Sequence, residues 1–110
     1  MSVLLLIPTW KVEQYITSTF NKNAHIYAMV TIYILALENG KYYVGKTNNI
    51  QTRIAEHFSN YGSQWTKIYK PLEVINIIEN CEDYDEDKWV IKIMGEHGVN
   101  NVRGGSFVNI

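Results

Sequence analysis

The sequence contains a single cysteine, so no disulfide can form within the chain. This fits a reducing compartment, and Cys81 is most simply a small hydrophobic side chain in the core. Long apolar runs are also missing. The nearest candidate, Val3 to Ile7, is far shorter than the ~20 residues that cross a bilayer, and it lacks a basic flank or a cleavage site of small residues. We therefore expect a soluble, intracellular protein of the cytoplasm or nucleus, without a membrane partner.

A strong net charge is missing as well, since the formal value is -1 at pH 7, and the total does not point to nucleic acid. The distribution of charge is uneven. Residues 38–70 hold five of the basic side chains against two acids, whereas residues 71–87 hold seven acids and no base. Such asymmetry would let one face meet a polyanion while another stays solvated or holds a cation. A mixed, solvated surface is the alternative interpretation.

The length of 110 residues fits one compact domain, and an apolar fraction of 46% is enough for a single core without metal or disulfide. Residues 1–28 differ from the rest, because their apolar positions only loosely follow one side of a helix. We treat 1–28 as an N-terminal extension for which the pattern predicts no firm structure. We assign 29–107 to the folded domain and 108–110 to a tail.

The run VTIYILAL (30–37) is rich in β-branched and aromatic residues and is followed by ENG and then KYYVG. This pattern predicts a β-hairpin. Its register decides which tyrosines share a face of the sheet. A two-residue loop of Asn39 and Gly40 would separate Tyr33 from Tyr43. A three-residue loop that includes Glu38 would put both tyrosines on one face, and the sequence permits either loop.

A helix is predicted after Gly45, with Asn48 or Asn49 as its cap. Arg53 and His57, four residues apart, lie on one line of this helix, beside the stripe that we expect to be buried. That stripe consists of Ile50, Ile54 and Phe58. The two polar side chains should therefore face the edge of the sheet rather than bulk water.

Ser63 is a candidate cap for a short turn that Pro71 ends. Residues 72–78 read as a third strand, apolar on both faces and therefore predicted to be central. The last helix is predicted over 85–97, with Asp83 and Glu86 as a capping box. Glu86 lies near the centre of its buried stripe.

An inward carboxylate needs a partner, because an unpaired buried charge is costly. Glu86 has two interpretations: it bonds the Asp83 amide as part of the capping box, or it holds a divalent cation together with waters and a substrate phosphate, a mode that suits Mg²⁺. Taken singly, Arg53 is an ordinary surface cation and His57 a satisfied, half-buried imidazole. The tyrosines are ordinary core aromatics.

Taken together and in order, these residues resemble the GIY-YIG nuclease domain. The similarity spans roughly residues 29–107. Its elements are TIYI (31–34), YVGKT (43–47), Arg53, His57, Glu86 and the late segment NNVRGGSF. The resemblance implies an α+β fold with a small three-stranded antiparallel sheet flanked by helices, and metal-dependent hydrolysis of DNA phosphodiester bonds.

The resemblance also implies roles for individual residues. The implied catalytic set is Tyr33, Tyr43, Arg53, His57 and Glu86, with Glu86 as the metal ligand. The residues implied to bind substrate are Gly45, Lys46 and Asn101. Two positions depart from the family pattern, since Thr31 replaces the glycine of the first motif and Val44 the isoleucine of the second. Both lie outside the reacting set.

The chemistry accounts for these residue types. Mg²⁺ or another divalent cation on Glu86 would polarise the phosphate, and Arg53 would clamp a nonbridging oxygen through its fork of donors. One tyrosine would accept a proton from the attacking water, which requires nearby cations to lower a phenol pKa near ~10. The sequence does not say which tyrosine this is.

The leading hypothesis is therefore a metal-dependent DNA endonuclease of low sequence specificity. No separate DNA-binding module fits in the chain, so binding to DNA should be weak and salt-dependent, and a separate DNA-binding or recruiting protein is an expected partner. The first alternative is a nucleic-acid-binding module of the same fold without catalysis. The second is a protein-interaction domain that uses the acidic stretch 79–87.

Overall fold

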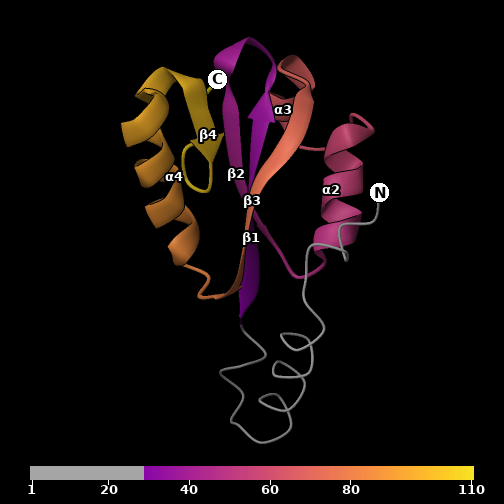
Figure 1. Ribbon diagram of the computed structural model, residues 1–110, viewed down its shortest axis with the longest axis vertical. Coiled ribbons are helices and arrows are strands. Elements are labelled where there is room, and N and C mark those ends of the chain that lie inside the picture. Colours follow the sequence, from indigo (N-terminus) through magenta and orange to yellow (C-terminus); the bar gives the residue numbers. More distant parts are fainter. Residues whose placement is uncertain (1–28) are drawn as a thin grey trace, which may run out of the picture.

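A computed structural model describes residues 29–110 of the protein. A four-stranded sheet lies between α4 on one side and α2 with α3 on the other (Figure 1). The strands, in the spatial order β3-β1-β2-β4, are β1 (Val30–Leu37), β2 (Tyr42–Thr47), β3 (Pro71–Cys81) and β4 (Val102–Gly104). The helices are α2 (Ile50–Phe58), α3 (Gln64–Ile68) and α4 (Asp85–His97), with the 3₁₀ turns η3 (Glu38–Gly40) and η4 (Val99–Asn101).

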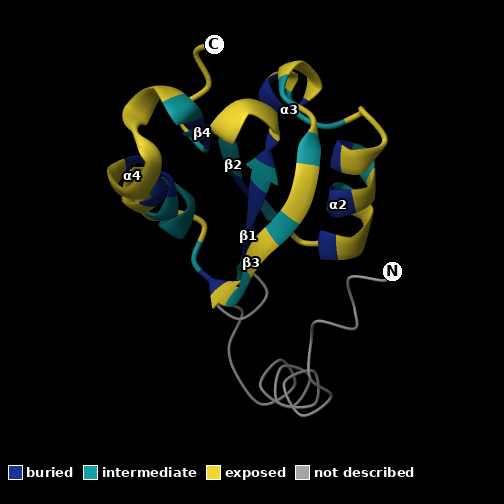
Figure 2. Cartoon of the chain, turned by 45° about the horizontal axis from the view of Figure 1, so that its top comes forward, coloured by how far each residue is buried: buried dark blue, intermediate teal, exposed yellow. Residues whose placement is uncertain are grey.

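Strand β1 builds a core on each face of the sheet, because successive side chains of a strand point to opposite faces. Ile32 and Ile34 pack in one cluster with residues of α4, whereas Tyr33 and Leu35 pack in a second cluster with residues of α2 and α3. Figure 2 shows exposed residues on the outer sides of the helices and buried residues on the central strands. The lone Cys81 is buried in the α4 cluster, as predicted.

The β1–β2 hairpin has the three-residue loop. Leu35 pairs with Tyr43, and the Leu37 amide donates to the Lys41 carbonyl at 2.7 Å across residues 38–40. Asn39 sits in the loop in the left-handed region, at φ 59°, which asparagine tolerates better than most residues. Tyr33 and Tyr43 therefore share one face of the sheet.

Two predictions about the sheet are wrong. The α+β class holds, but the sheet is mixed rather than three-stranded and antiparallel, because β4 adds a strand parallel to β2. That strand has three residues, too few to show a period. The strand predicted as central, β3, is an edge strand, and its Leu72 and Ile75 are 63% and 43% exposed. An apolar run on both faces did not mean burial on both faces.

The helix caps were predicted in part. Asn49 caps α2 by accepting from the Thr52 amide at 3.1 Å. Phe58, expected in the buried stripe, is 48% exposed, while His57 is buried.

The bounds of α4 match the prediction, but its cap does not. The carboxylate of residue 85 accepts from the Glu82 amide at 2.8 Å, in place of the capping box predicted for residues 83 and 86.

The predicted extension over residues 1–28 lies outside the described residues. Within residues 29–110, no helix is long and apolar enough to cross a membrane.

Candidate active site

The two tyrosines of the hairpin lie next to each other over a glycine. The ring centroids of Tyr33 and Tyr43 are 6.2 Å apart, and Gly45 pairs with Tyr33 across the strands. A Cβ on Gly45 would lie 2.3 Å from the Tyr33 hydroxyl oxygen and 2.8 Å from the Tyr43 ring. A larger residue would therefore displace both rings, so the absence of a side chain at Gly45 allows this arrangement.

His57 is bonded on both sides of its ring. Its Nε2 lies 2.7 Å from the Tyr33 hydroxyl and its Nδ1 lies 2.9 Å from Thr66 Oγ1. The Thr66 hydroxyl donates to the Ser63 carbonyl at 3.1 Å, so its oxygen is left to accept from His57. We assign the tautomer in which Nδ1 carries the proton and Nε2 accepts from Tyr33.

Burial sets the charge of this histidine. His57 is 1% exposed, and desolvation, followed by the positive charge of Arg53, lowers its pKa to about 4. The imidazole is therefore neutral at physiological pH. It acts as a hydrogen-bond acceptor for Tyr33 rather than as a cation.

The sequence did not identify the groups that hold His57. Thr66 is 1% exposed, and a Cβ on Gly62 would lie 2.1 Å from His57 Nδ1. Ser63 caps α3, as predicted, by accepting from the Thr66 amide. The available signal was the spacing of Ser63 and Thr66, which indicates a cap but not a contact with a helix that precedes it.

The phenols of both tyrosines are protonated in this arrangement. Burial raises the pKa of Tyr33, and neighbouring Tyr43 raises it further, while Arg53 opposes both. Burial likewise raises the pKa of Tyr43 against the opposing effect of Arg53. Tyr33 has no exposed surface, whereas Tyr43 is only half-buried. The cations near the tyrosines do not outweigh desolvation here.

Arg53 lies on α2, beside the tyrosines. Its Nη1 donates to Glu56 Oε1 at 2.9 Å, and 31% of its side chain is exposed. Because the guanidinium carries several donors in a planar fork, one carboxylate does not exhaust its capacity for oxygen ligands. Arg53 is thus a partly exposed cation that borders the buried pair of Tyr33 and His57.

Glu86 lies in the first turn of α4, and its side chain is only 12% exposed. Burial raises its pKa, and the nearby ammonium of Lys46 opposes that shift. Lys46 Nζ lies 3.7 Å from Glu86 Oε1 and 2.7 Å from Asp83 Oδ1. The sheltered carboxylate thus has the ammonium of Lys46 and the backbone of Gly105 as its partners, in place of the Asp83 amide expected from a capping box.

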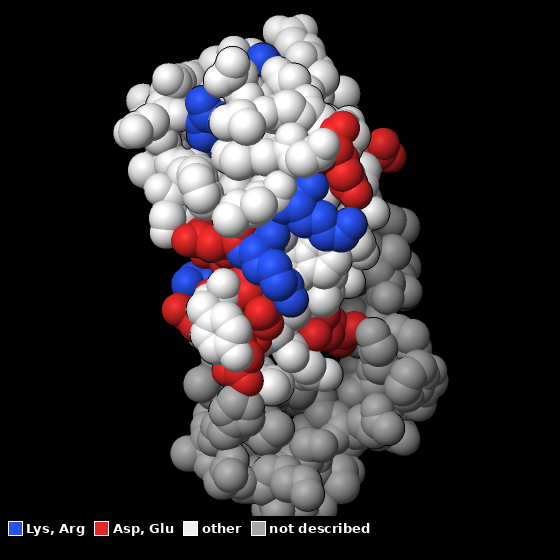
Figure 3. Space-filling view, turned by 90° about the vertical axis from the view of Figure 1, so that its left-hand side faces the viewer, with Lys and Arg blue, Asp and Glu red and all other residues white. Residues whose placement is uncertain are grey.

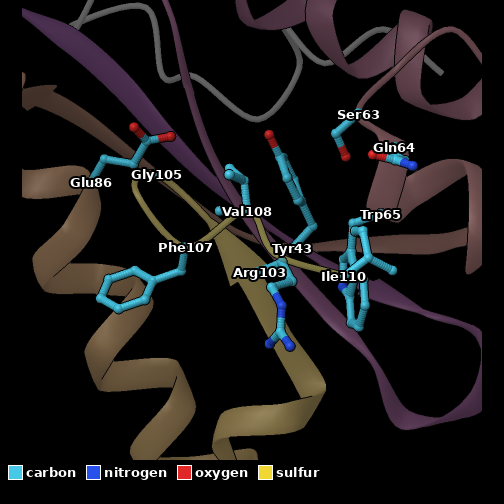
Figure 4. Close-up of a pocket in the computed structure, with 11 residues that line it drawn as sticks. Tyr43, Ser63, Gln64, Trp65, Glu86, Arg103, Gly105, Phe107, Val108 and Ile110 are labelled. Atoms are coloured by element: carbon cyan, nitrogen blue, oxygen red, sulfur yellow. The ribbon is translucent and has the colours of Figure 1, made fainter.

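Tyr43 and Glu86 line one cavity of about 260 Å³. Figure 4 shows the Tyr43 ring between Glu86 on one side and Ser63 with Gln64 on the other. These side chains come from β2, α4 and the start of α3. The remainder of the lining consists of Trp65, Arg103, Gly104, Gly105, Phe107, Val108 and Ile110. Residues far apart in the chain therefore form one open site.

The comparison with protein families decides the assignment. Residues 29–89, more than half of the chain, match the model of the GIY-YIG catalytic domain. The chain belongs to the GIY-YIG family. The resemblance inferred from the ordered motifs is thereby confirmed.

Curated relatives of this GIY-YIG chain include UPF0213 proteins of bacteria. One from Bacillus cereus is 36% identical over 62 residues, which is 56% of this chain and 58% of the relative. One from Xanthomonas campestris pv. campestris is 36% identical over 44 residues, 40% of this chain and 43% of the relative. The chain thus spans about half the length of the curated relatives it matches. No solved structure matches it significantly.

Most of the GIY-YIG residues lie together, but Asn101 does not. Its Oδ1 accepts from Lys41 Nζ at 2.8 Å, and its Nδ2 donates to the His97 carbonyl at 2.7 Å. His97 ends α4, roughly 16 Å along the helix from Glu86 at ~1.5 Å per residue. In this structure Asn101 therefore connects the far end of α4 to the hairpin.

The later part of the same motif does reach the site. The backbone and hydroxyl of Ser106 donate to the Asp87 carboxylate at 2.8 and 2.7 Å. Gly105 has φ +51°, and a Cβ there would lie 2.0 Å from Asp87 Oδ1. The glycine and serine therefore hold the first turn of α4, next to Glu86. The resemblance had instead singled out Asn101 as the functional residue of this segment.

The residues present fit a divalent cation held mainly by waters and substrate. Within residues 29–110 no group of three or more His, Cys, Asp or Glu side chains could hold a metal ion. Glu86 supplies one sheltered carboxylate beside the cavity, and the ammonium of Lys46 already lies near it. Mg²⁺ typically binds through one or two carboxylates while keeping several waters and a phosphate.

Proposed function

We propose that this protein is a metal-dependent endonuclease that hydrolyses DNA phosphodiester bonds with little intrinsic sequence specificity. The observation that supports it best is the shared cavity, in which Tyr43 and Glu86 face the same space. Arg53 and the buried pair of Tyr33 and His57 adjoin Tyr43. This is the combination that in-line attack on a phosphodiester requires: a water-orienting group, a cation for the phosphate and a carboxylate for a metal.

Glu86 is the residue that would hold Mg²⁺ or another divalent cation, together with waters and the phosphate. When bound, the cation supplies polarisation of the phosphate and stabilisation of the leaving oxygen. Arg53 binds a nonbridging oxygen through its fork of donors, which positions the phosphate and balances its developing charge. Lys46 adds a second positive charge, and Gly45 supports the site indirectly by leaving room for the rings of Tyr33 and Tyr43.

The two tyrosines have different roles in this proposal. Tyr43 contacts the attacking water, because it is the tyrosine that lines the cavity. Because burial raises the pKa of Tyr43, its hydroxyl is protonated near neutral pH and orients the attacking water through a hydrogen bond. Only the phenolate can accept the water's proton, so the rate should rise with pH. Tyr33 is fully buried, and its hydroxyl donates a hydrogen bond to Nε2 of His57. It is a positioning residue that fixes the Tyr43 ring and the adjoining helix.

DNA binding by this domain alone should be weak. Figure 3 shows Lys and Arg side chains on the α4 side of the molecule bordered by Asp and Glu, without a continuous basic surface. Few phosphate contacts give weak binding, and the affinity that they supply falls as salt rises. A separate DNA-binding or recruiting protein would then supply the specificity that this face lacks.

Nicking of supercoiled plasmid at low salt tests the proposal. The purified protein should convert supercoiled to open-circular DNA with Mg²⁺ and leave it intact with EDTA. Suppose instead that circular dichroism shows a folded protein and that this protein binds DNA, but that it cleaves no linear, supercoiled or branched DNA with Mg²⁺ or Mn²⁺. The protein would then be a binding module of this fold.

A further inference from the structure

Lys46 lies between two carboxylates that differ in exposure. Its ammonium is 2.7 Å from Asp83 Oδ1, a hydrogen-bonded ion pair, and 3.7 Å from Glu86 Oε1, a longer approach. The Asp83 side chain is 72% exposed, whereas that of Glu86 is 12% exposed. The lysine is therefore held mainly at the solvent side of the carboxylate that we propose as the metal ligand.

An ammonium this close to Glu86 opposes the binding of a second cation there. Two positive charges repel, and a sheltered carboxylate is screened by water less than an exposed one. The free energy of binding a divalent cation at Glu86 must therefore depend on where the lysine lies. Asp83 provides the place where the ammonium can stay while the oxygens of Glu86 turn to another cation.

We propose that Lys46 competes with the divalent cation for Glu86, and that Asp83 is a positioning residue which draws the ammonium away from that carboxylate. This inference rests on the proposed role of Glu86 as the metal ligand. A phosphate of bound nucleic acid is a further anionic partner for Lys46. Binding of substrate and binding of metal should therefore favour each other, because each is helped when the lysine leaves Glu86.

Binding of Mn²⁺ in the absence of DNA, followed by calorimetry or by the electron paramagnetic resonance signal of the free ion, tests this inference without activity. Lys46→Gln removes the competitor, so the Kd for Mn²⁺ should fall by about threefold to tenfold. Asp83→Asn leaves the ammonium with Glu86, so the Kd should rise by a similar factor. In the double variant the Asp83→Asn effect should shrink to about twofold at most, because no ammonium remains to be positioned.

Lys88→Gln is the matched control for loss of charge. Lys88 pairs with Asp85 at 3.5 Å in the same turn of α4, and its side chain is 69% exposed. This variant should change the Kd by about twofold at most, because surface pairs are weak. Thermal unfolding of each variant establishes that the comparison is between folded proteins.

Three results would overturn the inference, and they differ in whether the proposed metal role of Glu86 survives. If Asp83→Asn weakens Mn²⁺ binding equally with and without Lys46, Asp83 acts on the metal directly. If Lys46→Gln leaves the Kd unchanged while Glu86→Gln abolishes binding, the competition is absent but the proposed metal ligand stands. If no variant binds Mn²⁺ in a way that depends on Glu86, both the competition and the proposed metal role of Glu86 fall.

Discussion

The Tyr33 hydroxyl lies 2.7 Å from Nε2 of His57, within a core that leaves the two side chains 0% and 1% exposed. This bond joins the central strand β1 to α2, and Thr66 extends it to α3. The two tyrosines of the family motif are therefore in unequal surroundings. One is sealed in the core, and the other borders the cavity.

Replacing each tyrosine by phenylalanine should separate stability from activity. Tyr33→Phe leaves the buried Nε2 of His57 without a donor and should lower the free energy of unfolding by about 1–3 kcal/mol. Tyr43→Phe should change stability less but reduce nicking by at least about 100-fold. Urea denaturation and plasmid nicking on the same preparations provide the comparison. Full nicking activity in folded Tyr43→Phe would show that Tyr43 does not contact the water.

Acid should destabilise the protein through His57. Its pKa is lowered from 6.5 to about 4 in the folded protein. Between pH 6.5 and pH 4, His57 is therefore protonated in the unfolded chain but neutral in the folded protein. The contribution of neutral, buried His57 to the free energy of unfolding is therefore complete above pH 6.5. The free energy of unfolding should fall by roughly 3 kcal/mol as the pH is lowered toward 4. Urea denaturation across this range measures it. His57→Gln should have a flatter profile, and an equally steep one would assign the loss to other groups.

Gly45 should not tolerate a methyl group. Gly45→Ala places a Cβ within 2.3 Å of Tyr33, so it should destabilise the protein by at least about 2 kcal/mol and reduce nicking. Gly95→Ala is the matched control, because nothing lies within 4 Å of its Cβ position on α4. That change should stabilise the protein by up to about 1 kcal/mol. Equal melting temperatures for the two variants would contradict the close packing at Gly45.

The guanidinium of Arg53 should not be replaceable by an ammonium. Arg53→Lys retains the charge but loses the planar fork that binds phosphate oxygens, so nicking should fall by about tenfold or more with little change in stability. Binding of short duplex DNA should change less than the nicking rate. Wild-type activity in Arg53→Lys would show that only charge matters at this position.

The sequence predicted which of the motif residues lie close together better than it predicted the sheet. The motif order locates the tyrosines, Arg53, His57 and Glu86, because short motifs retain chemical residue types at recognisable spacings. The register of the hairpin was left open because an Asn-Gly pair fits both loops. The structure resolves it by placing Tyr33 beside Tyr43.

The remaining errors have a common physical cause, which is contact between distant segments. Pairing of three residues with β2 makes β4 a strand, and its position in the sheet, not its composition, makes β3 an edge. The partners of Glu86 are Lys46 of β2 and the backbone of Gly105, rather than the amide of its own helix cap. Thr66 reaches His57 from a different helix. None of these contacts leaves a local period or motif in the chain.

The most direct test of the account is the Mg²⁺-dependent nicking rate of Glu86→Gln beside that of Glu96→Gln. Both changes remove one carboxylate from α4, but Glu96 lies in the last turn and pairs with Lys92 at 3.2 Å. We predict that folded Glu86→Gln loses nicking and Mn²⁺ binding, while Glu96→Gln matches the wild type. Retention of Mg²⁺-dependent nicking by Glu86→Gln would contradict the assignment of this cavity as the metal-dependent nuclease site.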